Sequence, residues 1–392
     1  MKQISYPCPS CASTDLSVFY VVEQVPAHSV LLLATREQAL NYPTGNITLA
    51  YCQACGFITN IDFDASLHEY SSRYEETQGY SSTFNAFHQQ LAEHLIEKYD
   101  LRHKTVIEIG CGKGEFLRML CELGDNSGVG FDPAYIPGRI TSDRVTFIKD
   151  FYSEKYASYT ADFFCCKMTL EHIQDVAGFV GTVRRSIGDD TETVVFFQVP
   201  DFRRILQEIA FWDIYYEHCS YFSLGSLSRL FRKSGFEVTD LWRDYGDQYL
   251  MIEARSGRDQ TRERLQAEDD LDDLTKDLNI FVTNQVQKIQ KWRSEINAFM
   301  EDGCKVVLWG GGSKAVAFLT TLQIKPNKLQ YVVDINPYKS GTYMAGTGQE
   351  IVAPNFLIEY KPDVVIMMNP IYHVEIQQDL NKMGVQAKLM PV

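Results

Sequence analysis

Residues 106–116 read Val-Ile-Glu-Ile-Gly-Cys-Gly-Lys-Gly-Glu-Phe, and Asp132 ends the later run Gly-Val-Gly-Phe-Asp. The pattern predicts a strand, a glycine-rich turn, a helix and a second strand that ends in an acid. Gly110 and Gly112 would let the backbone approach a ligand closely, because they carry no Cβ. A carboxylate about 20 residues beyond such glycines can accept hydrogen bonds from ribose hydroxyls. This stretch therefore predicts a βαβ unit that binds a nucleoside-containing cofactor.

The class of cofactor depends on the acid at the end of the first strand. Dinucleotide sites usually read G-x-G-x-x-G and hold a pyrophosphate at the helix N-terminus. Here Glu108 precedes Gly110, Gly112 and Gly114. A carboxylate there disfavours a pyrophosphate and suits a cationic cofactor. The run resembles motif I of class I S-adenosylmethionine (SAM) methyltransferases, whose cofactor carries a positive sulfonium and amino group. Glycines that serve only the packing of a βαβ turn are the alternative.

Length and composition limit the classes of protein to which the chain can belong. Its 392 residues are 45% hydrophobic and 22% charged, as expected for a soluble globular protein of two or three domains. The net charge of −14 argues against a nucleic-acid partner, which needs patches of Lys and Arg. No apolar run approaches the ~20 residues that span a bilayer, and the N-terminus has no signal-peptide pattern. We therefore expect a cytoplasmic protein without a membrane partner.

Four of the ten cysteines form two close pairs, Cys8-x-x-Cys11 and Cys52-x-x-Cys55. Such pairs supply thiolates in twos, and tetrahedral Zn²⁺ takes four of them. Nothing suggests secretion, so close cysteines indicate a metal site rather than disulfides. With four cysteine ligands no position stays open for catalysis. The sequence therefore predicts structural zinc, with four unrelated buried thiols as the alternative.

Strand-like and helix-like segments alternate from residue 104 to about 255. This alternation predicts a mostly parallel, doubly wound α/β sheet. The last two strands resemble the antiparallel end of a class I methyltransferase sheet. Strands are predicted at 105–109, 128–132, 145–148, 162–166, 193–199, 236–241 and 249–254.

Two segments outside this sheet are predicted to be helical. Residues 66–100 end in a helical pattern, and residues 258–300 repeat apolar side chains at spacings of three to five. The second pattern predicts an amphipathic connecting helix that packs against a neighbouring domain or another subunit, so a homodimer is one expectation. The acid run 268–270 at its start is expected to be solvated surface.

A second nucleotide-type unit follows the connecting helix. Residues 305–309 predict a strand, and residues 310–315 read Gly-Gly-Gly-Ser-Lys-Ala, which fits G-x-G-x-x-A. The next strand ends at Asp334, and a further unit surrounds residues 363–368. The pattern alone fits a dinucleotide site. The chain therefore carries two Rossmann-like units, and only context can assign a ligand to each.

Titratable side chains gather between residues 213 and 223. Tyr215, Glu217 and His218 follow the strand that ends at Val199, on the sheet edge where ligands bind. These residue types move protons near neutral pH. His172 follows another strand and is expected to face the same crevice. A structural helix start with a satisfied histidine is the alternative. The tyrosine-rich segment 70–82 is either a surface loop or a lid.

Together these pieces resemble the SAM-dependent sugar C-methyltransferase family over nearly the whole chain. The motifs that carry the resemblance are the two cysteine pairs, the 108–114 run, Tyr215-x-Glu217-His218, and Lys339-x-Gly341 with Gly346-Thr347. The resemblance implies a zinc-binding domain (1–66), a class I SAM domain (67–256, with 67–100 as lid or helical lead-in), a connecting helix (257–300) and a C-terminal Rossmann-like domain (301–392).

The resemblance also implies the reaction, which is transfer of a methyl group from SAM to a carbon next to the ketone of a nucleotide-activated keto-deoxysugar. His218 is expected to remove the proton, Glu217 to orient it and Tyr215 to bind the oxyanion, with His172 as a further catalytic residue. The expected cofactor-binding residues are Tyr80, Glu108, Gly110, Cys111, Gly112, Asp132, Pro133, Asp150, Phe151 and Lys167. The expected substrate-binding residues are Tyr74, Tyr216, Tyr221, Gly311, Gly312, Lys314, Asp334 and Lys339. The expected zinc ligands are Cys8, Cys11, Cys52 and Cys55.

The chain departs from the family in the part that should hold the substrate. Residues 310–314 stand where the family commonly has Gly-Ala-x-x-Lys, and Ala345 replaces a proline before Gly346-Thr347. The sugar and its nucleotide are therefore not assigned. Two other functions stay open. One is methylation at oxygen or nitrogen of another small metabolite, and the other is a non-methylating protein that binds NAD(P) at its C-terminal unit.

Overall fold

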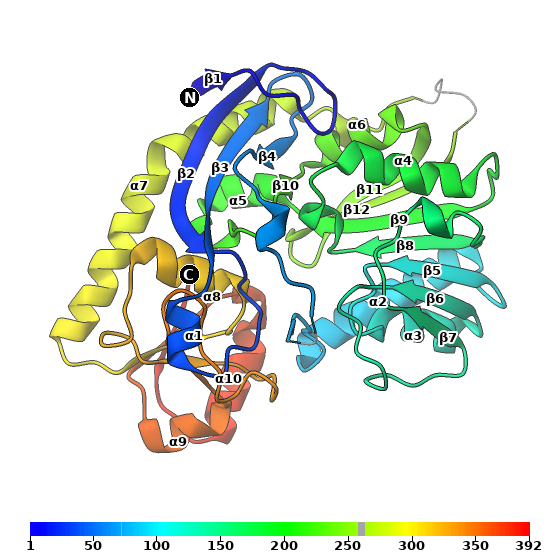
Figure 1. Cartoon of the computed structure of the whole chain (residues 1–392). Coiled ribbons are helices and arrows are strands. Elements are labelled where there is room, and N and C mark those ends of the chain that lie inside the picture. The colour runs from blue at the N-terminus through cyan, green and yellow to red at the C-terminus, as the bar shows by residue number, and fades with distance from the viewer. Residues whose placement is uncertain (72, 258–262) are drawn as a thin grey trace.

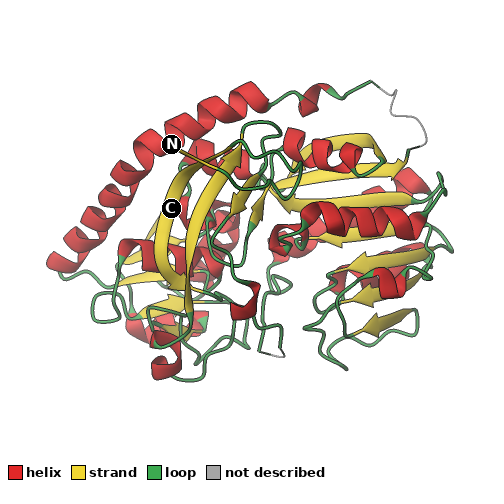
Figure 2. Cartoon of the chain, turned by 45° about the horizontal axis from the view of Figure 1, so that its top comes forward, coloured by secondary structure: helices red, strands yellow, loops and turns green. Residues whose placement is uncertain are grey.

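The computed structural model describes residues 1–71, 73–257 and 263–392, and three β-sheets organise them (Figures 1 and 2). The central sheet has seven strands in the order β11-β12-β9-β8-β5-β6-β7. Its strands β5 to β9 are parallel, whereas β11 and β12 run antiparallel at one edge. These strands are β5 (Thr105–Ile109), β6 (Ser127–Phe131), β7 (Val145–Ile148), β8 (Phe163–Lys167), β9 (Val194–Pro200), β11 (Phe236–Asp244) and β12 (Tyr249–Ser256). The predicted doubly wound sheet with its antiparallel end is confirmed.

The central strands are apolar on both faces, as the alternation of their side chains shows. Val106 and Phe163 pack in one buried cluster, and their neighbours Ile107 and Phe164 pack in another. Helices α2 (Ser82–Tyr99) and α3 (Glu115–Gly124) cover the first face, whereas α4 (Val176–Ile187) and α6 (Leu224–Lys233) cover the second (Figure 1). Because successive residues of a strand point to opposite faces, only a sheet covered on both sides needs such continuous apolar runs.

The C-terminal unit repeats the parallel design on a smaller scale. Its five strands are all parallel, in the order β15-β14-β13-β16-β17. They are β13 (Val306–Trp309), β14 (Tyr331–Val333), β15 (Glu350–Val352), β16 (Val364–Met367) and β17 (Lys388–Pro391), with helices α8 (Ser313–Leu322), α9 (Leu357–Tyr360) and α10 (His373–Lys382). Helix α8 packs on one face and α10 on the other. The second predicted Rossmann-like unit is therefore present.

The N-terminal sheet is completed by a strand from far along the chain. Its order is β1-β2-β3-β4-β10, and β10 (Ser220–Tyr221) pairs with β4 (Ile58–Asn60). The long antiparallel pair β2 (Leu16–Pro26) and β3 (Thr44–Cys52) forms most of this sheet, beside short β1 (Lys2–Ile4) and helix α1 (Arg36–Leu40). The domain boundaries at 66, 256 and 300 stay predictions, and this sheet crosses the first of them.

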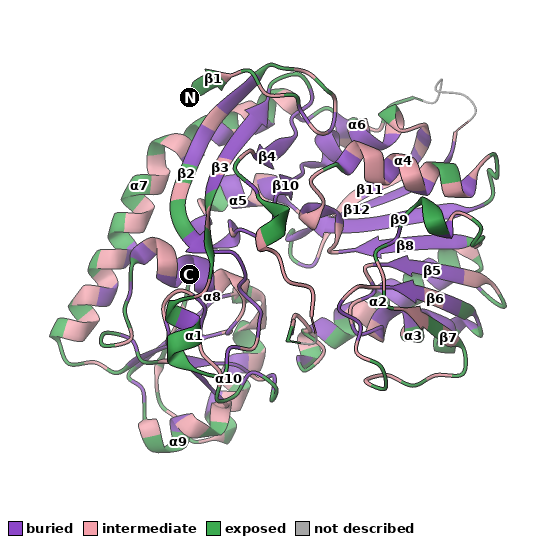
Figure 3. Cartoon of the chain, viewed as in Figure 1, coloured by how far each residue is buried: buried purple, intermediate pink, exposed green. Residues whose placement is uncertain are grey.

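One apolar core joins all three units. Phe19 of β2, Phe202 of α5 (Phe202–Glu208), Phe281 of α7 (Leu271–Glu301) and Phe318 of α8 belong to the same buried cluster. Helix α7 runs along the outside from the N-terminal sheet to the C-terminal unit, with its buried side facing both (Figures 1 and 3). The predicted packing of this helix against a neighbouring unit is confirmed within one chain.

Two predictions about the start of α7 are corrected. The helix begins at Leu271 and not at residue 258; residues 258–262 lie outside the described residues, and 263–270 contain only a short 3-10 turn. The acid run before it is solvated only at Asp269, because Glu268 and Asp270 are buried and pair with Arg232 at 2.6 Å and Arg229 at 2.9 Å. Among the described residues, none of the helices combines the length and apolar character needed to cross a membrane.

Candidate functional site

Two adjoining pockets lie at the carboxyl ends of the parallel strands. The smaller, of about 240 Å³, opens where β5, β6 and β8 end, beside the reversal of strand order between β5 and β8. Open α/β sheets bind ligands at such reversals. Of the ten predicted cofactor-binding residues, nine line this pocket: Glu108, Gly110, Cys111, Gly112, Asp132, Pro133, Asp150, Phe151 and Lys167. Tyr80 lines the larger pocket instead, and its ring lies near that of Tyr338.

Asp132 is held in place by the glycine turn. Its two carboxylate oxygens accept backbone N–H groups of Gly112 at 2.9 Å and Ala134 at 2.7 Å. Gly110, Gly112 and Gly114 all have positive φ, and a Cβ on Gly110 would collide with Thr169. The turn therefore needs glycine at these positions. Each carboxylate oxygen keeps a second lone pair, with which it can accept a ribose hydroxyl.

Burial changes the charges at the base of the smaller pocket. Glu108 and Lys167 are both buried, and burial raises the pKa of Glu108 to about 7 and lowers the pKa of Lys167 to about 8. Lys167 Nζ lies 3.0 Å from His88 Nε2. Burial, with Lys167 nearby, lowers the pKa of His88 to about 2, so this imidazole is neutral and accepts from the ammonium group. One oxygen of Glu108 has no hydrogen-bond partner within the described ranges.

The segment 70–82 lies across both pockets, although Ser72 is outside the described residues. Tyr74, Glu76 and Thr77 line both cavities. Buried Lys113 of the glycine turn donates to the backbone oxygen of Tyr74 at 2.7 Å and to Glu76 at 3.0 Å, and Thr77 donates to Glu115. These contacts fix the segment over the glycine turn, in the position that the lid alternative requires.

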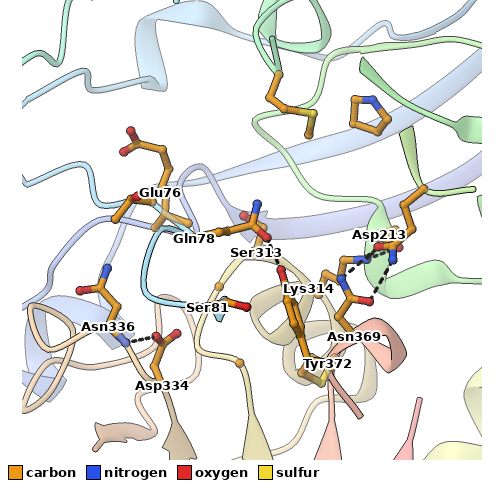
Figure 4. Close-up of a pocket in the computed structure, with 18 of the residues that line it drawn as sticks. Glu76, Gln78, Ser81, Asp213, Ser313, Lys314, Asp334, Asn336, Asn369 and Tyr372 are labelled. Atoms are coloured by element: carbon orange, nitrogen blue, oxygen red, sulfur yellow. Dashed lines mark hydrogen bonds and ion pairs between the residues drawn. The ribbon is translucent and has the colours of Figure 1, made fainter. Parts of the chain in front are cut away.

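The larger pocket, of about 320 Å³, extends from the central sheet to the C-terminal unit. At one end it is lined by His172, Tyr215 and His218, and at the other by Gly312, Lys314, Asp334 and Lys339. Figure 4 shows this second end, with Lys314 beside Asp213 and Asp334 beside Asn336. The predicted catalytic residues and the second glycine turn therefore share one cavity.

The second glycine turn repeats the geometry of the first. Asp334 accepts the N–H of Gly311 and the N–H of Asn336, both at 2.8 Å, as Asp132 accepts two N–H groups. The difference is Lys339, whose buried Nζ lies 3.4 Å from Asp334 and 3.2 Å from the oxygen of Gly311. The first turn presents a carboxylate alone, whereas the second presents a carboxylate paired with a cation.

A second cation approaches the pocket from helix α8. Lys314 Nζ lies 2.8 Å from Asp213 and 3.3 Å from the oxygen of the Gln248 side chain. Arg204 also contacts Asp213, at 3.1 Å. Asp213 therefore lies between two cations, of which Arg204 also pairs with Glu208 at 3.0 Å, and the Lys314 ammonium group is the cation that an anionic group in the cavity can share.

The tautomers of the two pocket histidines follow from their neighbours. His172 Nδ1 lies 3.0 Å from the backbone oxygen of Glu217, which can only accept, so Nδ1 carries the proton and Nε2 keeps a lone pair. The ring of His218 lies 4.8 Å from that of His172 and 4.2 Å from that of Tyr215. Burial, with His172 and Lys314 nearby, holds the pKa of His218 well below its usual value. Both histidines are neutral at pH 7 and can accept a proton.

Glu217 lines the larger pocket as predicted, but its carboxylate contacts other groups than the predicted His218. Its carboxylate accepts from the N–H of Ser29 at 2.8 Å, the hydroxyl of Ser29 at 2.6 Å and Nδ1 of His28 at 3.2 Å. The N–H of Glu69 donates to His28 Nε2, so the proton of that ring is on Nδ1. Although burial alone would raise it, these donors hold the pKa of Glu217 below its usual value. The carboxylate therefore binds the N-terminal unit.

Three predicted substrate-binding residues do not line the larger pocket. Tyr216 is fully buried, and its hydroxyl accepts the N–H of Asp64 at 2.8 Å, so it anchors the N-terminal sheet. Tyr221 lies in β10 and packs on Phe202. Gly311 holds Asp334 through its backbone N–H. The other five, Tyr74, Gly312, Lys314, Asp334 and Lys339, line the pocket.

Sequence reasoning missed several pocket residues. Glu171 stands beside His172 in the 3-10 turn Leu170–His172 and lines the larger pocket. Its position next to a predicted catalytic residue at the end of a strand was the available signal. For the other missed residues the sequence held no signal, because only the fold brings their segments to the cavity. These residues are Arg204, Gln248, Asn369 and Tyr372.

The four predicted zinc ligands meet at one point. The Sγ atoms of Cys8 and Cys55 are 3.7 Å apart, and those of Cys11 and Cys52 are 3.6 Å apart. Thiolates about 2.3 Å from a tetrahedral Zn²⁺ are about 3.8 Å apart, so the donor set fits the ion. A cluster of this kind closes the end of the β2–β3 pair, where Leu16 pairs with Cys52.

Two family models match the chain. Residues 80–241 match a methyltransferase domain, and residues 251–389 match the C-methyltransferase C-terminal domain. The C-methyltransferase NovU of Streptomyces niveus is 24% identical over 303 residues, which are 73% of this chain and 71% of NovU.

Solved structures of methyltransferases also resemble part of the chain. RosA, the N,N-8-amino-8-demethyl-D-riboflavin dimethyltransferase of Streptomyces davawensis, is 19% identical and covers 44% of this chain and 56% of its own, with a TM-score of 0.37. Human N-acetylserotonin methyltransferase, solved with SAM, is 15% identical and covers 45% and 59%, with a TM-score of 0.34.

Proposed function

Because the chain belongs to the SAM-dependent C-methyltransferases, we propose that it methylates a carbon next to the ketone of a nucleotide-linked keto-deoxysugar. The carrying observation is the continuous larger pocket. One end holds His172 and His218 against the smaller pocket, and the other holds the second glycine turn. A substrate with a reactive ring and a distant anionic group would fill both ends.

The smaller pocket fits SAM. Asp132 would accept the ribose hydroxyls, and exposed Phe151 offers its ring to the adenine. Glu108 and Lys167 offer a carboxylate and an ammonium group to the charged amino-acid end, and the unpartnered oxygen of Glu108 would gain a donor. SAM supplies an electrophilic methyl group. Tyr74 and His172 line both pockets, so the reacting atoms would meet beside them.

The C-terminal end of the larger pocket suits a diphosphate. Helix α8 has ten residues and begins at Ser313, so its free N–H groups face the cavity that Gly312 and Ser313 line. Lys314 and Lys339 add two cations. In a site for NAD the acid after the second strand accepts hydrogen bonds from a ribose, whereas here that acid, Asp334, already contacts Lys339. This contact favours a phosphorylated substrate group over NAD.

The proposed chemistry begins with removal of a proton from the carbon next to the ketone. His218 takes this proton as a neutral imidazole, and Tyr215 hydrogen-bonds the oxygen that becomes negative. Burial keeps the pKa of Tyr215 well above its usual value, so its hydroxyl stays a donor. The carboxylate of Glu217 binds His28 and Ser29 of the N-terminal unit. These bonds fix the backbone of Glu217, whose oxygen orients His172.

The test uses nucleoside diphosphate keto-deoxysugars in D₂O without SAM. Deuterium is expected to enter next to the ketone, and SAM is then expected to give a product heavier by one methyl group, seen by mass spectrometry. Methylation at oxygen or nitrogen without any exchange would contradict the enolate route. No reaction with any keto-sugar, but a thermal shift with NAD(P), would favour the oxidoreductase alternative.

Asp132 and Asp334 occupy equivalent positions in the two glycine turns, so their variants can be compared directly. Asp132→Asn is expected to weaken SAM binding about 10- to 100-fold, because hydrogen bonds to a charged acceptor are worth about 1.5–3 kcal/mol. Asp334→Asn changes the same atom in the second unit and is expected to leave SAM affinity unchanged while raising KM for the nucleotide sugar. Calorimetry with SAM and steady-state kinetics check both. Equal losses of SAM affinity would contradict the assignment of SAM to the first turn alone.

A further inference from the structure

Glu171 is a buried acid with unusual surroundings. It lies in the turn that follows β8, is 1% exposed and lines the larger pocket next to His172. Neither carboxylate oxygen has a hydrogen-bond partner among residues 1–71, 73–257 and 263–392. Buried polar atoms are almost always paired, so an orphaned carboxyl group in a pocket indicates a ligand that completes it.

The groups that face Glu171 offer it no counter-charge. His218 Nε2 lies 4.0 Å from Oε1, and His172 is the next residue. Both imidazoles are held neutral by burial, which lowers their pKa values. The other titratable groups around it are the neutral side chains of Tyr70, Cys166, Tyr215, Cys219 and Tyr249. A carboxylate without a partner is costly in such a place, and the group gives up its charge by binding a proton.

We propose that Glu171 is a catalytic acid of this enzyme: a neutral carboxyl group whose O–H donates a hydrogen bond to the substrate's ketone oxygen as that oxygen becomes an enolate. The inference rests on the proposed function. It places two donors, Glu171 and Tyr215, at one cavity end beside the base His218. Donors aimed at developing charge in a dry site stabilise a transition state strongly.

The proton and electron balance is simple. His218 takes the proton from the carbon, and the electrons of that C–H bond move into the enolate. Glu171 keeps its proton throughout and shares it with the enolate oxygen. The enolate carbon forms a bond to the methyl carbon, the methyl–sulfur bond breaks with its electrons passing to sulfur, and the ketone returns. The proton on His218 then leaves to solvent.

Burial raises the pKa of Glu171 to about 8, which gives the proposal a pH signature. Only the protonated form donates, so turnover should fall as pH rises through about 8. Glu171→Gln keeps a donor of similar shape and cannot ionise, so it should stay within about tenfold of the natural enzyme and lose this alkaline fall. Glu171→Ala removes the donor and should slow the reaction about 10²- to 10³-fold.

The experiment measures deuterium exchange next to the ketone without SAM, from pH 6 to 10, for the natural chain, both Glu171 variants and Glu192→Gln. Glu192 is exposed, pairs with Arg255 and lines neither pocket, so its variant is the matched control. Equal exchange by the natural chain and Glu171→Ala would overturn the proposal. So would an alkaline fall that persists in Glu171→Gln.

A second readout needs no substrate. A raised pKa means that the folded chain keeps a proton that the unfolded chain loses above about 4.5. The natural chain should therefore lose stability relative to Glu171→Gln as pH rises from about 4.5 to about 8, and no further above that. A pH-independent difference in urea unfolding would show that Glu171 is ionised and overturn the proposal.

The exchange and unfolding experiments distinguish failure of the proposed function from failure of the role proposed for Glu171. If the natural chain exchanges with no keto-sugar, the proposed function fails, and the unfolding experiment still decides whether Glu171 is neutral. Glu171, His172 and His218 could together hold a metal ion, since their ligand atoms lie within 4.8 Å of one another. Elemental analysis that finds a second metal equivalent, lost in Glu171→Gln, would assign Glu171 to that ion and overturn its role as an acid.

Discussion

Replacing His218 by Asn is expected to abolish methyl transfer while SAM still binds. The neutral imidazole is the proposed base, and loss of a general base typically costs about 10²- to 10⁴-fold. SAM affinity should persist because His218 lines only the larger pocket. Calorimetry with SAM, deuterium exchange and product formation should be measured on one preparation.

The matched control for this variant is His103→Asn. His103 is 77% exposed and pairs with Asp125 on the surface, away from both pockets. It should keep full activity. Substantial turnover by His218→Asn would transfer the role of base to His172, whose Nε2 lone pair is free, and His172→Asn would then be the inactive variant.

Replacing Cys52 by Ser is expected to destabilise the chain strongly and remove activity, although Cys52 lies outside both pockets. Structural Zn²⁺ sites supply about 10–16 kcal/mol at pH 7 in small domains, against roughly 5–15 kcal/mol for the net stability of a typical protein. The β2–β3 pair has the cysteine cluster at one end and Pro26 at the other, and His28 and Ser29 follow Pro26 after one residue. Loss of the ion should therefore release Glu217 from its N-terminal donors.

Cys304→Ser is the control, because Cys304 belongs to no cluster of ligands in the described part of the chain and should behave as the natural protein. Elemental analysis should find one zinc per chain in the control and none in Cys52→Ser. Circular dichroism and thermal melting report the folding. A metal-free Cys52→Ser that melts normally and turns over would contradict a structural ion.

The fold was largely predictable because its strands are covered on both faces. A strand such as 105–109 is then a continuous apolar run that ends at glycine, and the seven predicted strands of the central sheet are all present. The start of α7 was not predictable in this way. Glu268 and Asp270 look like surface acids in sequence, and only their pairing with arginines of α6 buries them.

The candidate site was predictable where it follows a strand end. Asp132, Lys167 and His172 obey this rule, and Asp334 obeys it in the second unit. Glu217 was predicted to contact His218, but its carboxylate contacts other residues. Its partners come from the loop after β2, almost 190 residues away, so no local pattern could reveal them. Tyr216 was misassigned because neighbouring residues in an irregular segment point in opposite directions.

The shared apolar core and the strand β10 set an order of events on the ribosome. Both cysteine pairs are made before strand β10, so the four thiolates would be available to a metal ion before the sheet is complete. The sheet around it stays incomplete until residues 220–221 are made, and its apolar face stays uncovered until α7 and α8 follow. A nascent chain of this kind carries an open strand edge from the time β4 is made until β10 follows. Expressed alone, residues 1–66 should aggregate, and only the complete chain should yield a soluble zinc unit.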